Sequence, residues 1–153
     1  MIESRAPKIQ LKVKHILVLL QFLTAAALVT STRFSMRHGL WLIVSALGML
    51  LGLWSIAAIK LPNVSIMPDV KSKTQLVTAG PYRFVRHPMY SALMLFCGGF
   101  VFTPYQWWKV LAWFVLLFVL IAKSSIEERQ LTERFSEYTG YSKRTFRFVP
   151  FLW

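Results

Sequence analysis

The sequence predicts an all-α, polytopic membrane protein with about four transmembrane helices. The chain has 153 residues, of which 56% are hydrophobic and only 16% are charged, a balance too apolar for an ordinary soluble domain of this size. The formal net charge is nevertheless +12, as in membrane proteins with basic cytoplasmic loops. We therefore treat residues 1–153 as a single membrane domain, with spans predicted at about 15–31, 40–59, 89–103 and 105–122.

The first apolar run follows a basic segment. Residues 1–14 carry four Lys or Arg, and residues 15–31 are apolar except mainly for Gln21 and Thr24. A basic start before an apolar run is typical of a signal peptide or of a first transmembrane helix. Because the run is longer than a typical signal core and nothing after it looks secreted, we expect a retained helix.

The second run, 40–59, has twenty residues, enough to cross a hydrocarbon core of about 30 Å at about 1.5 Å per residue. Gly48 and Gly52 are four residues apart in it, a spacing that permits close helix approach. The third run, 89–103, is shorter, so we expect its helix to be little tilted or to begin within the preceding loop.

The fourth run, 105–122, has tryptophans near its start that predict an interface anchor, and Lys109 is expected to extend toward that interface. From Lys123 the chain becomes polar but keeps a helical pattern. We expect this cytoplasmic helix to end at Gly140. The alternating basic and aromatic residues of 141–153 predict a segment lying on the membrane surface.

The charges are distributed unequally between the two sides of this four-span arrangement. Fifteen of the 18 Lys and Arg residues, and all six acidic residues, fall in the two terminal segments and the 60–88 loop. The positive-inside rule therefore places both termini and this loop in the cytoplasm. This distribution accounts for the basic charge without nucleic acid. The single cysteine, Cys97, excludes an intrachain disulfide.

Two polar segments stand out and are expected at the same membrane face. The first, 76–90, combines Gly, Pro, aromatic residues, Arg and His, and the second is Glu127-Glu128. Pro88 biases His87 away from helical backbone and can itself begin the third helix. A helix entrance suits a polar or anionic group, so we predict a cofactor site. Neighbouring helical residues point about 100° apart, so one of the two glutamates is expected to face it.

Each residue alone has a simpler explanation. Tyr82 and Tyr90 fit an interfacial aromatic belt, Arg83 and Arg86 fit lipid-phosphate contacts, and His87 fits a helix cap. The acidic pair fits simple partnership with nearby arginines, because carboxylates near a bilayer are costly unless paired. Their combination on one face favours the cofactor site.

These residues also resemble a family. The segments Leu76-Val77-Thr78-Ala79-Gly80-Pro81-Tyr82-Arg83 and Arg86-His87-Pro88-Met89-Tyr90, then Glu127-Glu128 after one more apolar helix, resemble the integral-membrane methyltransferases typified by isoprenylcysteine carboxyl methyltransferase, to which phospholipid N-methyltransferases are related. The resemblance covers roughly residues 40–150 and is closest to a compact bacterial member, which implies the bacterial inner membrane as the location. It implies S-adenosylmethionine as cofactor, a cytoplasmic pocket partly covered by the C-terminal segment, and a lipophilic small-molecule or lipidated acceptor that enters from the bilayer.

The resemblance also implies roles for individual residues. It places Lys123 where the family has an arginine for the substrate carboxylate, and Lys can bind a carboxylate without the bidentate fork. No metal is required. The catalytic group is expected to be His87, Arg86 and Glu127. The cofactor-binding residues are expected to be Gln75, Leu76, Val77, Gly80, Tyr82, His87, Pro88, Met89, Tyr90, Glu127 and Glu128.

Other functions stay open at this point. Within the enzyme class, methylation of a phospholipid amine headgroup is the alternative to a carboxyl acceptor. A non-catalytic membrane scaffold is a second alternative and would bind no S-adenosylmethionine. A small proton-coupled exporter is disfavoured, because such proteins need an acidic residue within a span and the four predicted spans have none.

Overall fold

The computed structural model of the chain describes residues 5–32, 39–59 and 76–150. This part of the chain is all-helical and contains no strand, which confirms the predicted fold class. The elements are α1 (Arg5–Thr30), α2 (Gly39–Ile59), the short 3-10 helix η3 (Gly80–Arg83), α3 (Pro88–Val101), α4 (Trp107–Arg134) and α5 (Tyr138–Ser142).

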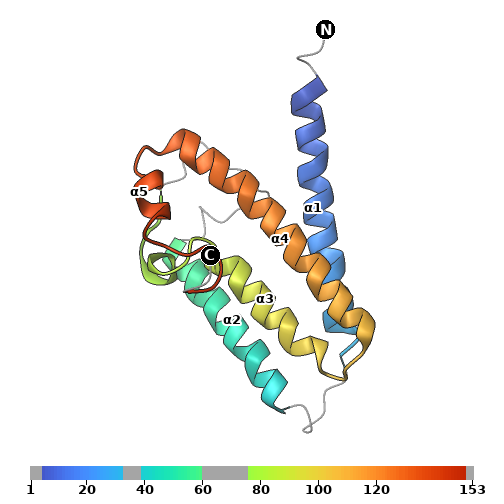
Figure 1. The fold of residues 1–153 in the computed structure, drawn as a ribbon. Helices are drawn as coiled ribbons and strands as arrows, with labels where there is room; N and C mark the ends of the chain where they lie inside the picture. Colours follow the sequence, from blue (N-terminus) through green and yellow to red (C-terminus); the bar gives the residue numbers. More distant parts are fainter. Residues whose placement is uncertain (1–4, 33–38, 60–75, 151–153) are drawn as a thin grey trace.

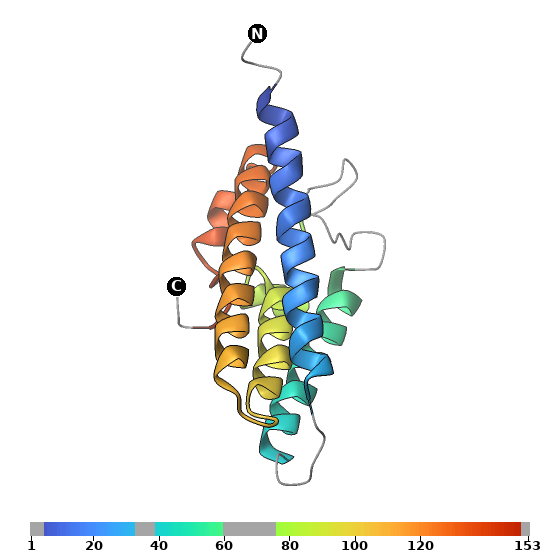
Figure 2. The same ribbon diagram turned by 90° about the vertical axis from the view of Figure 1, so that its right-hand side faces the viewer.

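The four long helices alternate in direction along the chain (Figure 1). The start of α3 and the last turns of α4 lie at one end of the bundle, together with η3 and α5; we call this the polar end. The end of α1, the start of α2 and the connection between α3 and α4 lie at the opposite end. Figure 2 shows α1 running alongside α4, with α2 and α3 as the second pair.

Three helices are long and apolar enough to cross a membrane, and α3 is a shorter apolar helix. The molecule is therefore a polytopic membrane protein. α3 has 14 residues and a length of about 21 Å, whereas α4 has 28 residues and a length of about 42 Å. The last turns of α4 consequently extend past the beginning of α3, and this brings an acidic pair to the entrance of the shorter helix.

Small residues let α2 and α3 approach each other closely. The Ser45 hydroxyl donates to the carbonyl oxygen of Phe96 at 2.9 Å. A Cβ added at Gly48 would lie 2.8 Å from the carbonyl oxygen of Ala92, and one at Gly99 would lie 2.8 Å from the backbone nitrogen of Ser45. Gly48, which has the spacing to Gly52 noted in the sequence, thus lies in the contact between the two helices, as small residues do in membrane helix pairs.

The apolar core joins α1, α3 and α4. It consists of buried Leu28, Met94, Cys97, Val101, Leu116 and Leu120. The outer faces of the helices carry large exposed apolar side chains, such as Leu53 and Phe118. In water this pattern would be unfavourable, but it suits a surface covered by lipid.

Lys109 does not extend to the interface as the sequence predicted. Its side chain is fully buried, and its ammonium group donates to the carbonyl oxygens of Ser31 at 3.3 Å, Phe100 at 3.4 Å and Thr103 at 3.3 Å. These carbonyl groups belong to the C-terminal ends of α1 and α3, where partial negative charge favours a cation. The prediction was wrong because two helix ends meet where α4 begins.

The polar helix after the fourth run ends earlier than predicted. α4 stops at Arg134, and Phe135 has an extended backbone with φ −116° and ψ 114°. Gly140 lies inside the separate helix α5 instead of ending the long one. The break at Phe135 turns the chain back toward the start of α3.

Candidate active site

A sharp turn leads the chain into α3. Gly80 has φ +59°, a left-handed conformation that favours glycine, and a Cβ there would also lie 3.1 Å from Cβ of Ala58. Pro88 occupies the first turn of α3, and His87 is the residue before the helix, with φ −124°. This is the arrangement that the His-Pro sequence predicted, and it fixes His87 at the helix entrance.

The two predicted polar segments meet at His87. Its Nε2 lies 3.1 Å from Oε1 of Glu128, and its Nδ1 lies 3.5 Å from Oε2 of Glu127. The prediction that the segments meet is therefore confirmed. The imidazole ring lies between the two carboxylates and contacts both, and the expectation that one glutamate faces a cofactor stays a prediction.

Glu128 is surrounded by cationic groups. Arg86 donates from Nε to Oε1 of Glu128 at 2.8 Å, and Nε of Arg147 lies 3.5 Å from the same oxygen. Arg86 also donates from Nη1 to the carbonyl oxygens of Ser142 at 2.8 Å and Thr145 at 2.5 Å. Glu128 and Arg86 together connect α4, the start of α3 and the segment after α5.

Glu127 has a different set of partners. The Tyr90 hydroxyl donates to Oε1 of Glu127, and the rings of Tyr90 and His87 stack with centroids 5.4 Å apart and an interplanar angle of 11°. Tyr90, His87 and Glu127 thus form one compact unit. The carboxylate of Glu127 contacts a neutral phenol, whereas the carboxylate of Glu128 contacts two arginines. Glu127 is therefore better placed than Glu128 to bind a ligand.

The protonation of His87 follows from its position between two carboxylates. Burial lowers the pKa of the His87 ring, but the hydrogen bonds and negative charges of Glu127 and Glu128 raise it by more, so its pKa lies above the ordinary value. A protonated ring donates from both nitrogens. His87 can therefore hold both carboxylates in place at once.

The segment after α5 lies over this turn, and its position on the membrane surface stays a prediction. Val85 and Phe146 form a parallel bridge, and the backbone N–H of His87 donates to the carbonyl oxygen of Arg147 at 3.1 Å. Arg147 donates from Nη2 to the hydroxyl of Ser125 at 2.6 Å. Figure 1 shows this segment passing beside the start of α3.

Two tyrosines support the same region from α5 and η3. The Tyr141 hydroxyl donates to the backbone oxygen of Tyr82 at 2.7 Å. Burial raises the pKa of Tyr141 to about 12, so this hydroxyl remains a neutral donor over the physiological range.

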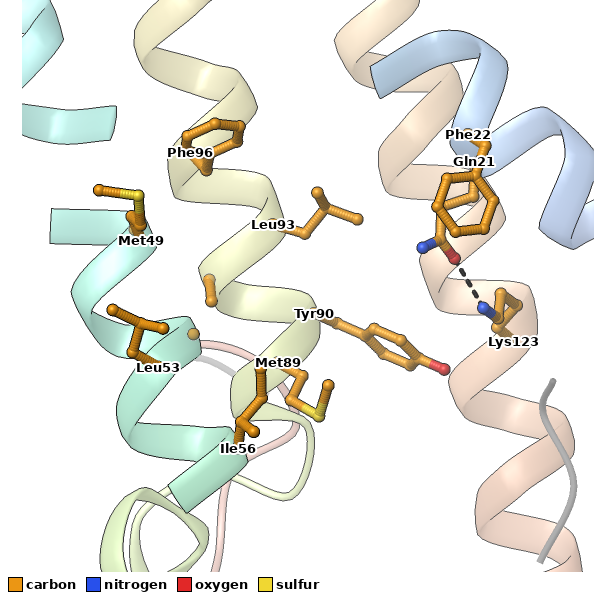
Figure 3. Close-up of a pocket in the computed structure, with 13 residues that line it drawn as sticks. Gln21, Phe22, Met49, Leu53, Ile56, Met89, Tyr90, Leu93, Phe96 and Lys123 are labelled. Carbon is orange, nitrogen blue, oxygen red and sulfur yellow. Dashed lines mark hydrogen bonds between the residues drawn. The ribbon is translucent and has the colours of Figure 1, made fainter. Parts of the chain in front are cut away.

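A cavity of about 400 Å³ lies beside Tyr90 (Figure 3). Its polar side chains are Tyr90, Lys123 and Gln21. Lys123 donates from Nζ to Oε1 of Gln21 at 2.6 Å and lies 5.4 Å from the centroid of the Tyr90 ring. The apolar part of the lining is formed by Phe22, Gly48, Met49, Gly52, Leu53, Ile56, Met89, Ala92, Leu93 and Phe96.

A comparison with protein families assigns the chain to a family. Residues 34–138, more than half of the chain, match the family described as phospholipid methyltransferase. The chain belongs to the phospholipid methyltransferase family. A comparison with curated proteins gives no significant match. The protein is therefore a membrane methyltransferase, and the residues of the cluster, from Arg86 to Glu128, lie within the matched region.

In this methyltransferase the structure brings together most of the predicted site. Arg86, His87, Tyr90, Glu127 and Glu128 form the connected cluster. The remaining predicted residues have the following positions: Pro88 at the start of α3, Met89 and Lys123 in the cavity wall, buried Tyr82 in η3, Gly80 at its turn, and half-buried Leu76 and Val77 in the irregular backbone before it. Gln75 lies outside the described residues.

Sequence reasoning missed three side chains that lie in the cavity wall or contact the cluster: Gln21, Ser125 and Arg147. Gln21 was visible only as a polar exception in an apolar run, and Arg147 as one basic residue among several in the C-terminal segment. The residues next to them in the sequence gave no indication that either side chain contacts α4. Among the residues that the structure describes, no group of three or more His, Cys, Asp or Glu could hold a metal ion.

Proposed function

We propose that the protein transfers a methyl group from S-adenosylmethionine to a lipophilic acceptor at the cytoplasmic face of the membrane. The observation that carries this proposal is the Tyr90–His87–Glu127 unit beside the cavity of a phospholipid methyltransferase family member. The acceptor is an isoprenylcysteine-like carboxylate or a comparable lipid headgroup.

The residues present fit the proposed cofactor. A carboxylate such as that of Glu127 can bind an ammonium group or ribose hydroxyls through charge-assisted hydrogen bonds. The face of Tyr90 suits a sulfonium group through cation–π attraction. The neighbouring cavity, of about 400 Å³, lies within the size range of small-molecule sites. When bound, S-adenosylmethionine supplies an electrophilic methyl group.

The protein's own contribution is then positioning and exclusion of water. His87 and Arg86 hold the two carboxylates, and Tyr90 orients Glu127. The segment around Arg147 covers the helix entrance from the other side. The predicted roles of Gln75, Leu76, Val77, Gly80, Tyr82, Pro88 and Met89 as further parts of the cofactor wall belong to this proposal.

The direction of the bundle in the membrane follows from charge. Fifteen of the 18 basic residues fall in the two terminal segments and the 60–88 loop of the sequence. We assign that end, with both termini, to the cytoplasm by the positive-inside rule, and the protein to a bacterial inner membrane. A polar cofactor then enters from the cytoplasm and a lipophilic acceptor from the bilayer.

A phospholipid amine is the second candidate acceptor, and the family match favours it. A protonated amine must lose its proton before methylation, and we assign that step to the carboxylate of Glu127, because His87 already carries a proton between the two carboxylates. Incubation with lipid extract and a labelled methyl donor separates the two acceptors. A methyl ester releases labelled methanol in base, whereas a methylated amine keeps its label.

Calorimetric titration of S-adenosylmethionine into detergent-purified protein tests the proposal. We expect micromolar binding by the wild type and loss of binding in Glu127→Gln and His87→Ala. Glu133→Gln is the matched control, because Glu133 pairs with Arg129 at an exposed position of the same helix. Absence of binding by folded wild type, in lipid as well as detergent, would return the chain to the non-catalytic scaffold alternative.

A further inference from the structure

A second cavity, of about 540 Å³, lies on the other side of α3 from the cavity beside Tyr90. Its wall is formed by α2, α3, α4, the turn before α3 and the segment after α5. Leu93 and Phe96 line the first cavity, whereas Ser91 and Leu95 line the second, and at about 100° per residue these pairs lie on opposite faces of α3. Among the described residues the two cavities share no wall residue, so the proposed methyl transfer makes no use of the second.

The wall of this second cavity is almost wholly apolar. The hydroxyl of Ser91 donates to the carbonyl oxygen of Phe148 at 2.5 Å. The indole N–H of Trp113 donates to the carbonyl oxygen of Met94 at 3.0 Å. Both groups are therefore bonded within the protein. Because a water molecule needs two to four polar partners to stay in a cavity, hydrocarbon fits this space better than water does.

The second cavity opens to the outer surface of the bundle. Three of its wall residues, Trp54, Leu95 and Val149, are 52%, 43% and 49% exposed, and they continue the apolar outer faces that suit lipid. An α-helix with its side chains is about 10–12 Å thick and would fill about 540 Å³ with little more than one turn. A flexible chain that enters from the bilayer fits the space better than a helix of a second protein.

We propose that the second cavity binds one hydrocarbon chain of a bilayer lipid as a structural ligand, and that the bound chain holds the segment after α5 against the bundle. This lipid is not the methyl acceptor, because α3 separates the cavity from Tyr90. An empty cavity loses the dispersion contacts of its wall. Since lipid tails are as apolar as the wall, the gain from binding comes from these packing contacts.

The bound chain reaches the polar end through Phe148. Phe148 and Val149 belong to the cavity wall, and the Phe148 ring lies 5.8 Å from the His87 ring between centroids. The same segment is attached to the turn before α3, where the backbone N–H of Phe146 donates to the carbonyl oxygen of Phe84 at 3.0 Å. A chain that packs on Phe148 therefore opposes the opening of this hydrogen bond, which exchange of the Phe146 amide reports.

The first experiment is native mass spectrometry of the full chain released from nanodiscs of dioleoylphosphatidylcholine. We expect the wild type to retain one lipid. Leu117→Trp should lose it, because Leu117 is half-buried in the cavity wall and a larger ring there occupies the space. Leu51→Trp makes the same change from α2, and if one of the two variants does not fold, the other decides the question.

Leu111→Trp is the matched control, because Leu111 is on the same helix as Leu117, is 56% exposed and lies outside the cavity wall. It should retain the lipid. Retention by folded Leu117→Trp and Leu51→Trp at the wild-type level would overturn the proposal. Absence of a retained lipid from the wild type would also overturn it, and retention that appears on deletion of 151–153 would then assign the cavity to those residues.

The second experiment separates the hydrocarbon chain from the headgroup. Delipidated protein in digitonin, a detergent with a rigid steroid body, is titrated with hexadecane, and hydrogen exchange of the Phe146 amide is followed. At a concentration ten times the dissociation constant, exchange in the wild type should slow about tenfold, whereas exchange in Leu117→Trp should not respond. Slowing by dioleoylphosphatidylcholine but not by hexadecane would overturn the assignment to a hydrocarbon chain.

Neither experiment uses a methyl donor, so the inference is independent of the proposed function. Failure of the folded wild type to bind S-adenosylmethionine would end the proposed function and leave the hydrocarbon site in place. Equal lipid retention by the wild type and the two cavity-filling variants would end this inference and leave the proposed function in place.

Discussion

Nε2 of His87 lies 3.1 Å from Oε1 of Glu128, and this contact joins the residue before α3 to the polar end of α4. The two residues are 41 positions apart. The same carboxylate accepts a hydrogen bond from Arg86, so Glu128 holds the start of α3 against the polar end of α4. We therefore expect substitutions at this end of the bundle to change stability and ligand binding to different extents.

Glu128→Gln should destabilise the protein strongly, although the other contacts of the fold remain. The substitution leaves Arg86 and the largely buried Arg147 beside a neutral amide, and breaking a buried ion pair costs about 3 kcal/mol. Thermal unfolding in detergent measures the loss. Glu133→Gln, which breaks an exposed pair with Arg129, should change stability by less than about 1 kcal/mol. Equal effects of the two substitutions would contradict the central position of Glu128.

Stability should fall as pH rises through the titration of His87. The folded-state pKa of His87 is raised above its ordinary value of 6.5 by the two carboxylates, against the opposing effect of burial. The His87 contribution is therefore fully present below pH 6.5 and is lost as pH passes the folded-state pKa.

The measurement is the difference in melting temperature between wild type and His87→Gln, from about pH 6 to about pH 9. We expect the difference to shrink toward high pH. A difference that grows with pH would mean that the folded state holds the neutral ring.

Gly99→Ala should destabilise the α2–α3 pair. An added Cβ would lie 2.8 Å from the backbone nitrogen of Ser45, and overpacking of this kind costs about 1–3 kcal/mol. Gly39→Ala is the control, because a Cβ there meets nothing within 4 Å. Thermal unfolding of the two variants side by side tests the contact, and an unchanged melting temperature for Gly99→Ala would show that the helices can separate without loss.

Lys109→Met should lower stability without changing cofactor affinity. The ammonium group serves three carbonyl oxygens, and leaving buried acceptors without their donor costs about 1–3 kcal/mol. Because Lys109 is in the first turn of α4 and Glu127 is near the other end of this helix, which reaches the polar end (Figure 1), S-adenosylmethionine binding by calorimetry should stay at the wild-type level. Lys143→Met, at an exposed position, controls for loss of charge. A weakened affinity in Lys109→Met alone would indicate coupling between the two ends.

The features that were predictable from the sequence are those that depend on neighbours along the chain. Apolar runs of about twenty residues predicted α1, α2 and the first part of α4 because crossing a bilayer requires length. Pro88 predicted the start of α3 and the position of His87 because proline restricts the residue before it. The unequal charges predicted that the two polar segments share one end, and the contacts of His87 with Glu127 and Glu128 confirm it.

The features that were missed depend on partners far along the chain. Lys109 is buried because the ends of α1 and α3 meet beside it, and no local pattern announces that meeting. Arg147 reaches Ser125 only because α4 stops at Arg134 and the chain turns back. The contact of Gln21 with Lys123 was not predictable, because the two residues are 102 positions apart in the chain.

The placement of Lys109 fixes α1 to α4 at a second point. The ammonium group of Lys109 donates to the carbonyl oxygen of Ser31 after the end of α1, and Lys123 donates to Oε1 of Gln21, ten residues earlier and about 15 Å away along α1. Two contacts this far apart hold α1 in one register against α4. The wall that α1 gives to the cavity beside Tyr90 therefore depends on a lysine at the other end of the bundle.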